Sequence, residues 1–124
     1  MTTVLVTGAT GTVGAQVVRE LQTQAVPVRA LVRDPEAAAA RLGPVELAVG
    51  DFADRASLRR ALRGVSRVFL SSADGPEKVA HEQAVIDAAA EVGIERIVKL
   101  SAINARMDSP LPTFAWHGAI EHHL

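Results

Sequence analysis

The chain has 124 residues, a length typical of one domain, and 48% of them are hydrophobic, which is enough to form a core. A net charge of −1 at pH 7 gives no electrostatic reason to expect binding to nucleic acid or to an anionic membrane. The absence of cysteine excludes a disulfide framework, a thiolate nucleophile and a cysteine-ligated zinc site. With neither a basic N-terminal region nor a run approaching ~20 apolar residues, the sequence predicts a soluble, cytoplasmic protein.

Short apolar runs alternate with helical stretches from one end of the chain to the other. The run 3–7 is rich in β-branched residues and apolar on both faces, which is typical of a strand buried in a parallel sheet. In the next stretch, Val13, Val17 and Leu21 recur every four residues and form one helical stripe. Such patterns predict strands at 3–7, 26–32, 45–49, 67–71 and 96–101, and helices at 12–24, 34–43, 54–64, 76–93 and from 112 onward.

Capping residues support these boundaries. Asp34 is expected to cap the second helix, with Pro35 at its first position and Gly43 at its end. Pro27 is tolerable at the start of the second strand if it lacks only an edge donor. On the helix 76–93, Val85, Ala89 and Val92 line up, as do Ile86 and Ala90.

Strict alternation of strands and helices with short connections predicts a doubly wound parallel α/β sheet of the Rossmann type. The expected strand order is 3-2-1-4-5, and residues 1–124 form one domain. The longest irregular segment, 102–112, follows the fifth strand at the carboxyl edge, where open α/β sheets bind ligands.

The most specific motif is the segment VTGATGTVG, in which Gly8, Gly11 and Gly14 are spaced three apart between the first strand and its helix. Glycines in this context allow a tight turn, a close approach of pyrophosphate to the backbone and close helix packing. The helix start offers free N–H groups and a positive dipole end to phosphates. The alternative is a tight turn without a ligand. The residues expected to bind a dinucleotide here are Gly8, Thr10, Gly11, Thr12, Val13 and Gly14.

Arg33 is expected to determine which nicotinamide cofactor binds. It stands at the tip of the second predicted strand, where an acidic residue would instead bind the ribose 2′-hydroxyl of NAD. A guanidinium at this place can bind a 2′-phosphate through two charge-assisted hydrogen bonds. Asp34 could in principle serve NAD, but helix capping is its expected function. The sequence therefore favours NADP, and the alternative is that Arg33 is an ordinary solvated charge.

The glycine spacing with its leading threonine resembles the extended and atypical short-chain dehydrogenase/reductases. The segments ALVRDP, GDFADRASLRRALRGVSRVFL, KLSA and WHGAIE follow in the order found in the NmrA-like branch. That branch contains NADPH-dependent quinone and dye reductases and also non-catalytic NADP sensors. The resemblance implies that Asp51 and Phe52 lie at the adenine, although Asp51 could merely start a turn and Phe52 pack in the core. By the topology rule, Ser71 and Ser72 should lie beside the cofactor.

The resemblance also bears on catalysis. Typical short-chain dehydrogenases use a tyrosine and a lysine four residues later, but this chain contains no tyrosine. His117 and Glu121 have the same spacing, and His117 is a candidate proton donor because an unperturbed histidine titrates near neutrality. Ser101 matches the family's serine position and could hydrogen-bond a substrate oxygen. The competing interpretation of His117 is a surface or capping residue. A zinc site is not expected, because His122 is rotated off the face that His117 and Glu121 share.

In the resembling family, further strands and helices build the substrate pocket, so the chain is expected to stop before the substrate-binding part. It is then either a piece of a longer reductase or a shortened paralogue. The predicted function is an NADPH-dependent reductase that passes hydride to a quinone-like or similar conjugated acceptor. The alternative is a non-catalytic NADP(H)-binding redox sensor. The open edge of the fifth strand predicts a homo-oligomer.

Overall fold

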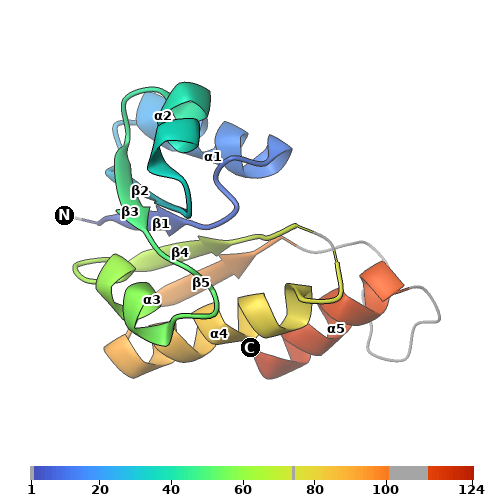
Figure 1. Ribbon diagram of the computed structural model, residues 1–124. Coiled ribbons are helices and arrows are strands. Elements are labelled where there is room, and N and C mark those ends of the chain that lie inside the picture. Colours follow the sequence, from blue (N-terminus) through green and yellow to red (C-terminus); the bar gives the residue numbers. More distant parts are fainter. Residues whose placement is uncertain (1, 74, 101–111) are drawn as a thin grey trace.

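A five-stranded parallel sheet with the order β3-β2-β1-β4-β5 forms the centre of the protein (Figure 1). The computed structural model describes residues 2–73, 75–100 and 112–124. The predicted fold class and strand order are confirmed. The strands are β1 (Val4–Val6), β2 (Val28–Val32), β3 (Glu46–Val49), β4 (Arg67–Leu70) and β5 (Arg96–Lys99).

Helices cover both faces of the sheet. In Figure 1, α1 and α2 lie on one side of the sheet, and α3, α4 and α5 lie on the other. This arrangement follows from right-handed crossovers, because the chain runs outward from β1 to β3 and then crosses to β4 and β5. The helices are α1 (Thr12–Thr23), α2 (Pro35–Leu42), α3 (Arg55–Ala61), α4 (Lys78–Val92) and α5 (Pro112–His123).

The two faces of the sheet have separate apolar cores. Consecutive strand residues point to opposite faces, so Leu5 packs with α3, α4 and α5 while Val6 packs with α1 and α2. Both side chains are buried. The larger core includes Leu58, Leu62, Leu70, Val85, Ile86 and Ile120, and the smaller includes Val18, Val28, Ala30, Val32 and Ala38.

The expected cap of α2 is confirmed. Asp34 Oδ1 accepts hydrogen bonds from the backbone N–H groups of Glu36 and Ala37, at 3.1 and 3.2 Å. Pro35 is the first residue of the helix, and Gly43 follows its end with a φ of 71°. Within the ranges that the structure describes, no helix is both long enough and apolar enough to cross a membrane.

Two local details go beyond what the sequence predicted. Pro27 is not an edge residue of the sheet, because β2 is an interior strand; Pro27 lies just before it, and its carbonyl accepts a hydrogen bond from Val4 N at 3.0 Å. Val92 is 43% exposed, since α4 ends there, whereas Lys78 and Glu82 are buried on the same helix. The buried side of α4 therefore carries charged residues as well as apolar ones.

Candidate functional site

The glycine segment forms a tight turn between β1 and α1. Gly8 has a φ of +63°, a conformation that side chains rarely adopt, and a Cβ there would lie 2.5 Å from Ser71 Oγ. A Cβ on Gly14 would lie 2.0 Å from the carbonyl oxygen of Gly8, so the start of α1 can approach the turn only without a side chain. These two positions need glycine for the fold itself.

Gly11 differs from these two glycines. A Cβ on it would meet no atom closer than 3.3 Å, and the residue is exposed. It is also the N-cap of α1 and, as a glycine, supplies no side-chain cap to the first turn of this helix. Backbone N–H groups and the positive end of the helix dipole are thus presented to the edge of the sheet, an arrangement suited to phosphate.

A hollow of about 570 Å³ lies over this turn; we call it the glycine-loop hollow. It brings together all the residues predicted to bind the dinucleotide in the segment 8–14, and Ser71 and Ser72 from the end of β4. His117 from α5, Lys78 from α4 and Leu100 complete its lining. The candidate proton donor thus faces the same space as the candidate phosphate loop.

Two further hollows adjoin the first, since all three share Ser72 and Ala73 in their linings. The β2-side hollow, of about 300 Å³, is lined by Arg33, Phe52 and part of the glycine turn. The α4-side hollow, of about 400 Å³, is lined by Arg33, Phe52, Lys78 and His81. Together the three hollows follow the carboxyl ends of the strands. An elongated ligand could place its phosphates at the glycine turn and its remaining parts in the adjoining hollows. The residues therefore fit a dinucleotide.

The hydroxyl groups of Ser71 and Ser72 already have partners. Ser71 Oγ donates to Thr7 O at 3.0 Å, and Thr7 Oγ1 donates to Ser71 O at 2.7 Å, so the ends of β1 and β4 are held together. Ser72 Oγ donates to Glu82 Oε2 at 2.6 Å. Both serines line the hollow, and their contact with a cofactor stays a prediction.

Asp51 and Phe52 have different surroundings. Asp51 Oδ1 accepts a hydrogen bond from Ala53 N at 2.8 Å, so this carboxylate does start a turn. Phe52 packs partly against the larger core and lines two hollows. Its ring stacks on His81 with centroids 4.7 Å apart and an interplanar angle of 16°. His81 thus helps to form the wall of the α4-side hollow.

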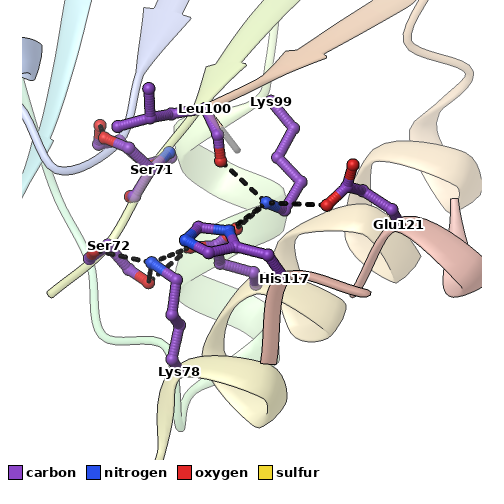
Figure 2. A network of polar contacts seen from close by, with 9 residues as sticks. Ser71, Ser72, Lys78, Lys99, Leu100, His117 and Glu121 are labelled. Carbon is purple, nitrogen blue, oxygen red and sulfur yellow. Dashed lines mark hydrogen bonds and ion pairs between the residues drawn. The ribbon is translucent and has the colours of Figure 1, made fainter. Parts of the chain in front are cut away.

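Figure 2 shows a network of charged groups, most of them buried, and two of its members, Lys78 and His117, also line the glycine-loop hollow. Lys78 Nζ is 2.9 Å from Glu82 Oε2 and donates to Ser72 O at 2.9 Å. Lys99 Nζ is 4.0 Å from Glu82 Oε1 and 3.7 Å from Glu121 Oε2. The side chains of Lys78 and Lys99 are each 3% exposed, and that of Glu82 is fully buried.

His117 belongs to this network. Its side chain is buried, which contradicts the competing interpretation of a surface residue. The ring Nδ1 is 2.6 Å from Lys99 Nζ, and Lys99 Nζ also donates to Leu100 O at 2.7 Å. Burial lowers the pKa of Lys99 below that of an ordinary lysine, because the ammonium loses hydration, and the charge of Lys78 acts in the same direction. Glu82 and Glu121 oppose the shift.

Sequence reasoning missed Lys78 and Glu82. A signal was present, because positions 78, 82, 85 and 89 fall on one helical stripe and the last two are apolar. Ser101, the second catalytic candidate, lies outside the described residues. Among the residues that are described, no group of three histidine or acidic side chains is arranged to hold a metal ion.

The parallel sheet, the glycine turn and the hollows along the carboxyl edge define a Rossmann domain that binds a nicotinamide dinucleotide. The sequence profile of the NAD(P)H-binding family matches residues 8–123. The chain belongs to this family, in its NmrA-like branch of atypical short-chain dehydrogenase/reductases.

Several relatives are NAD(P)H-dependent reductases. The NAD(P)H azoreductase of Xenophilus azovorans is 41% identical over 118 residues, an alignment that covers 93% of this chain and 41% of the relative. The quinone oxidoreductase 2 of Escherichia coli is 32% identical over 106 residues, covering 82% and 37%. The crystal structure of Citrobacter sp. triphenylmethane reductase with NADP(H) superposes with a TM-score of 0.82 at 30% identity, covering 97% and 44%. The chain thus spans less than half the length of these relatives.

Proposed function

We propose that this chain binds NADP(H) as part of an NmrA-like reductase that passes a hydride to a quinone-like or similar conjugated acceptor. The observation that carries the proposal is the position of His117, which is 5% exposed and lines the same hollow as the glycine turn. A group able to give a proton therefore faces the space where a cofactor would lie. The related azoreductase, quinone oxidoreductase and triphenylmethane reductase support an acceptor with a conjugated electron system.

The preference for NADP is argued from Arg33 and Asp34. Arg33 is exposed at the end of β2 and lines both flanking hollows, so its guanidinium can reach a 2′-phosphate there. Asp34 uses its carboxylate for the cap of α2 and is a poor candidate for the ribose 2′-hydroxyl of NAD. These separate roles of Arg33 and Asp34 favour NADP over NAD.

The bound cofactor would supply the hydride. The chain's own residues would bind and orient the cofactor and would protonate the acceptor. The first turn of α1 would hold the pyrophosphate through backbone N–H groups, with the hydroxyls of Thr10 and Thr12 as further donors. His117 would give a proton to the acceptor. Because the chain contains no tyrosine, His117 is the candidate source of this proton.

Cofactor choice is tested by titrating the protein with NADPH and with NADH and following nucleotide fluorescence. We expect tighter binding of NADPH, and a loss of roughly tenfold to a hundredfold in Arg33→Ala, because one charge-assisted phosphate contact contributes about 1.5–3 kcal/mol. Arg60→Ala on α3 is the matched control, since this exposed arginine is not part of the three hollows. Equal affinities for the two cofactors would contradict the preference.

Hydride transfer is tested by acceptor-dependent oxidation of NADPH with a panel of quinones, using the product of the whole encoding reading frame. His117→Ala should lower the rate roughly 10²-fold or more without changing the affinity for NADPH, as expected for the loss of a general acid. His122→Ala, at an exposed position of the same helix, serves as the control. Tight NADPH binding without turnover of any acceptor would favour a redox sensor instead.

A further inference from the structure

The contact between Lys99 and His117 joins two side chains that are hidden from solvent. Lys99 extends from the end of β5, and His117 lies on α5, 18 positions further along the chain. Their closest atoms, Lys99 Nζ and His117 Nδ1, are 2.6 Å apart. In Figure 2 the lysine reaches the ring from the side of β5, while the ring is part of the lining of the glycine-loop hollow.

The polar atoms nearest to Lys99 Nζ are oxygens that accept hydrogen bonds or carry negative charge, as expected around an ammonium. Carboxylate oxygens of Glu121 and Glu82 lie 3.7 and 4.0 Å from Nζ, and the carbonyl oxygen of Leu100 accepts a hydrogen bond from it. An ammonium can only donate hydrogen bonds. His117 Nδ1 must then accept, so the neutral imidazole carries its proton on Nε2.

We propose that Lys99 is the positioning residue of His117, holding the ring in the Nε2–H tautomer and supplying a proton to Nδ1 as the Nε2 proton leaves. The proton transfer in this inference rests on the proposed reductase function, whereas the tautomer of His117 is a property of the chain alone. The sequence identified His117 as a candidate and left Lys99 without a function.

The proton transfer balances as follows. An acceptor that has gained a hydride has gained two electrons and one hydrogen, and it needs one proton to become neutral. The N–H bond at His117 Nε2 breaks, and that proton bonds to the reduced acceptor. At the same time an N–H bond of the Lys99 ammonium breaks, and its proton bonds to His117 Nδ1. The ring stays neutral throughout, and Lys99 becomes an amine. A proton from solvent then reaches Nε2 from the side of the hollow, and the Nδ1 proton returns to the Lys99 amine, so that both groups regain their starting forms.

Burial and the charge of Lys78 help Lys99 to give up a proton, whereas Glu82 and Glu121 oppose its loss. Glu82, Glu121, Lys78 and His117 are the titratable groups facing it, from α4 and α5. Glu82 is shared, because its Oε2 is 2.9 Å from Lys78 Nζ and also accepts from Ser72 Oγ, whereas its Oε1 has no hydrogen-bond partner among the described residues. One fully buried carboxylate therefore serves two buried lysines, and burial lowers the pKa of Lys99.

The tautomer can be measured without cofactor. Long-range ¹H–¹⁵N NMR spectra of the ¹⁵N-histidine-labelled chain, above the titration range of histidine, distinguish a proton on Nε2 from one on Nδ1. His117→Gln assigns the signals, and His122, which is exposed, is an internal reference. We expect the Nε2–H form of His117 to predominate in the parent chain.

Variants of Lys99 distinguish a residue that positions the His117 ring from one that only packs against it. Lys99→Met keeps a long unbranched side chain but removes the donor, and it should raise the Nδ1–H fraction of His117 severalfold. Lys99→Arg keeps a permanently charged donor and should restore the Nε2–H form. If Lys99→Met does not fold, as judged by circular dichroism, a parent ring protonated on Nδ1 would still overturn the inference.

A parent ring protonated on Nδ1, or a Lys99→Met spectrum identical to that of the parent, would overturn the inference. These results do not depend on turnover. Failure of the proposed function would appear separately, as NADPH binding without acceptor reduction in a chain whose His117 still has the Nε2–H form.

Discussion

At the scale of single residues, the most unusual feature is a fully buried glutamate between two buried lysines. Glu82 has Lys78 Nζ at 2.9 Å and Lys99 Nζ at 4.0 Å. Removing charges from water costs several kcal/mol per ion, and good geometry is needed to offset this cost. Lys78 has that geometry, with donation to Ser72 O as well. Lys99 is held less closely by the carboxylate, which agrees with the lowered pKa of this lysine.

The lowered pKa of Lys99 predicts a pH-dependent free energy of unfolding. Between the folded pKa and about 10.5, the unfolded chain holds a proton that the folded chain has lost, so stability rises with pH in this window. Relative to Lys99→Met, the parent should gain stability toward pH 10.5, with a slope of at most about 1.4 kcal/mol per pH unit. Urea unfolding of both chains at several pH values measures it.

Lys99→Arg is the control for this prediction, because a guanidinium stays charged over the whole range and should show no such gain. The difference in free energy of unfolding between the parent and Lys99→Met is the quantity to follow. If it stays constant or falls as the pH rises, Lys99 does not lose its proton more readily in the folded state.

At the scale of elements, the turn between β1 and α1 combines two different demands for glycine. Gly8 and Gly14 meet the needs of the fold, because a Cβ at either would collide with neighbouring atoms. A Cβ on Gly11 would make only one tight contact, 3.3 Å from Gly8 O, but Gly11 stands where phosphate would approach the helix. A substitution at Gly14 should therefore mainly lower the stability of the fold, whereas one at Gly11 should mainly impair nucleotide binding.

Gly14→Ala should destabilise the fold by about 2 kcal/mol or more, since its Cβ would lie 2.0 Å from Gly8 O. Gly11→Val should cost no more than about 1 kcal/mol, the scale of an N-cap change, yet abolish NADPH binding because the side chain occupies the phosphate site. Thermal unfolding and calorimetric titration of both variants measure the two effects. Unchanged affinity in Gly11→Val would show that this glycine does not face the ligand.

The elements could be predicted because their signals are local. Apolar runs, the Asp34 cap and the glycine spacing determine strands, helix starts and the first turn through neighbouring residues, and these predictions agree with the structure. The buried network could not be predicted in this way. Lys78 and Lys99 are far apart in sequence and look like surface residues, and they become buried only when α4, α5 and β5 pack together.

At the scale of the whole molecule, the two sides of the sheet are covered unequally. In Figure 1, α3, α4 and α5 lie on one side and α1 and α2 on the other, and α1 contacts β1 and β2. On β5, Ile97 packs against the larger core, while Val98 points to the opposite face and is 56% exposed. Leu100, just past the strand, is 37% exposed. In the described part of the chain, β5 pairs with β4 alone, so its other edge offers unpaired backbone groups.

We therefore predict that this 124-residue chain self-associates through β5. An open edge beside exposed apolar side chains favours pairing with a second copy, which would satisfy the backbone groups and cover Val98. Sedimentation velocity at increasing concentration should show dimers or larger species. Val98→Lys should shift the population toward monomer, because a charge on an edge strand opposes such pairing. Val49→Lys is the matched control, since Val49 is equally exposed, at 56%, on the opposite edge strand β3. A parent chain that is monomeric at all concentrations would refute the prediction, and dissociation caused equally by Val49→Lys would place the contact elsewhere than at β5.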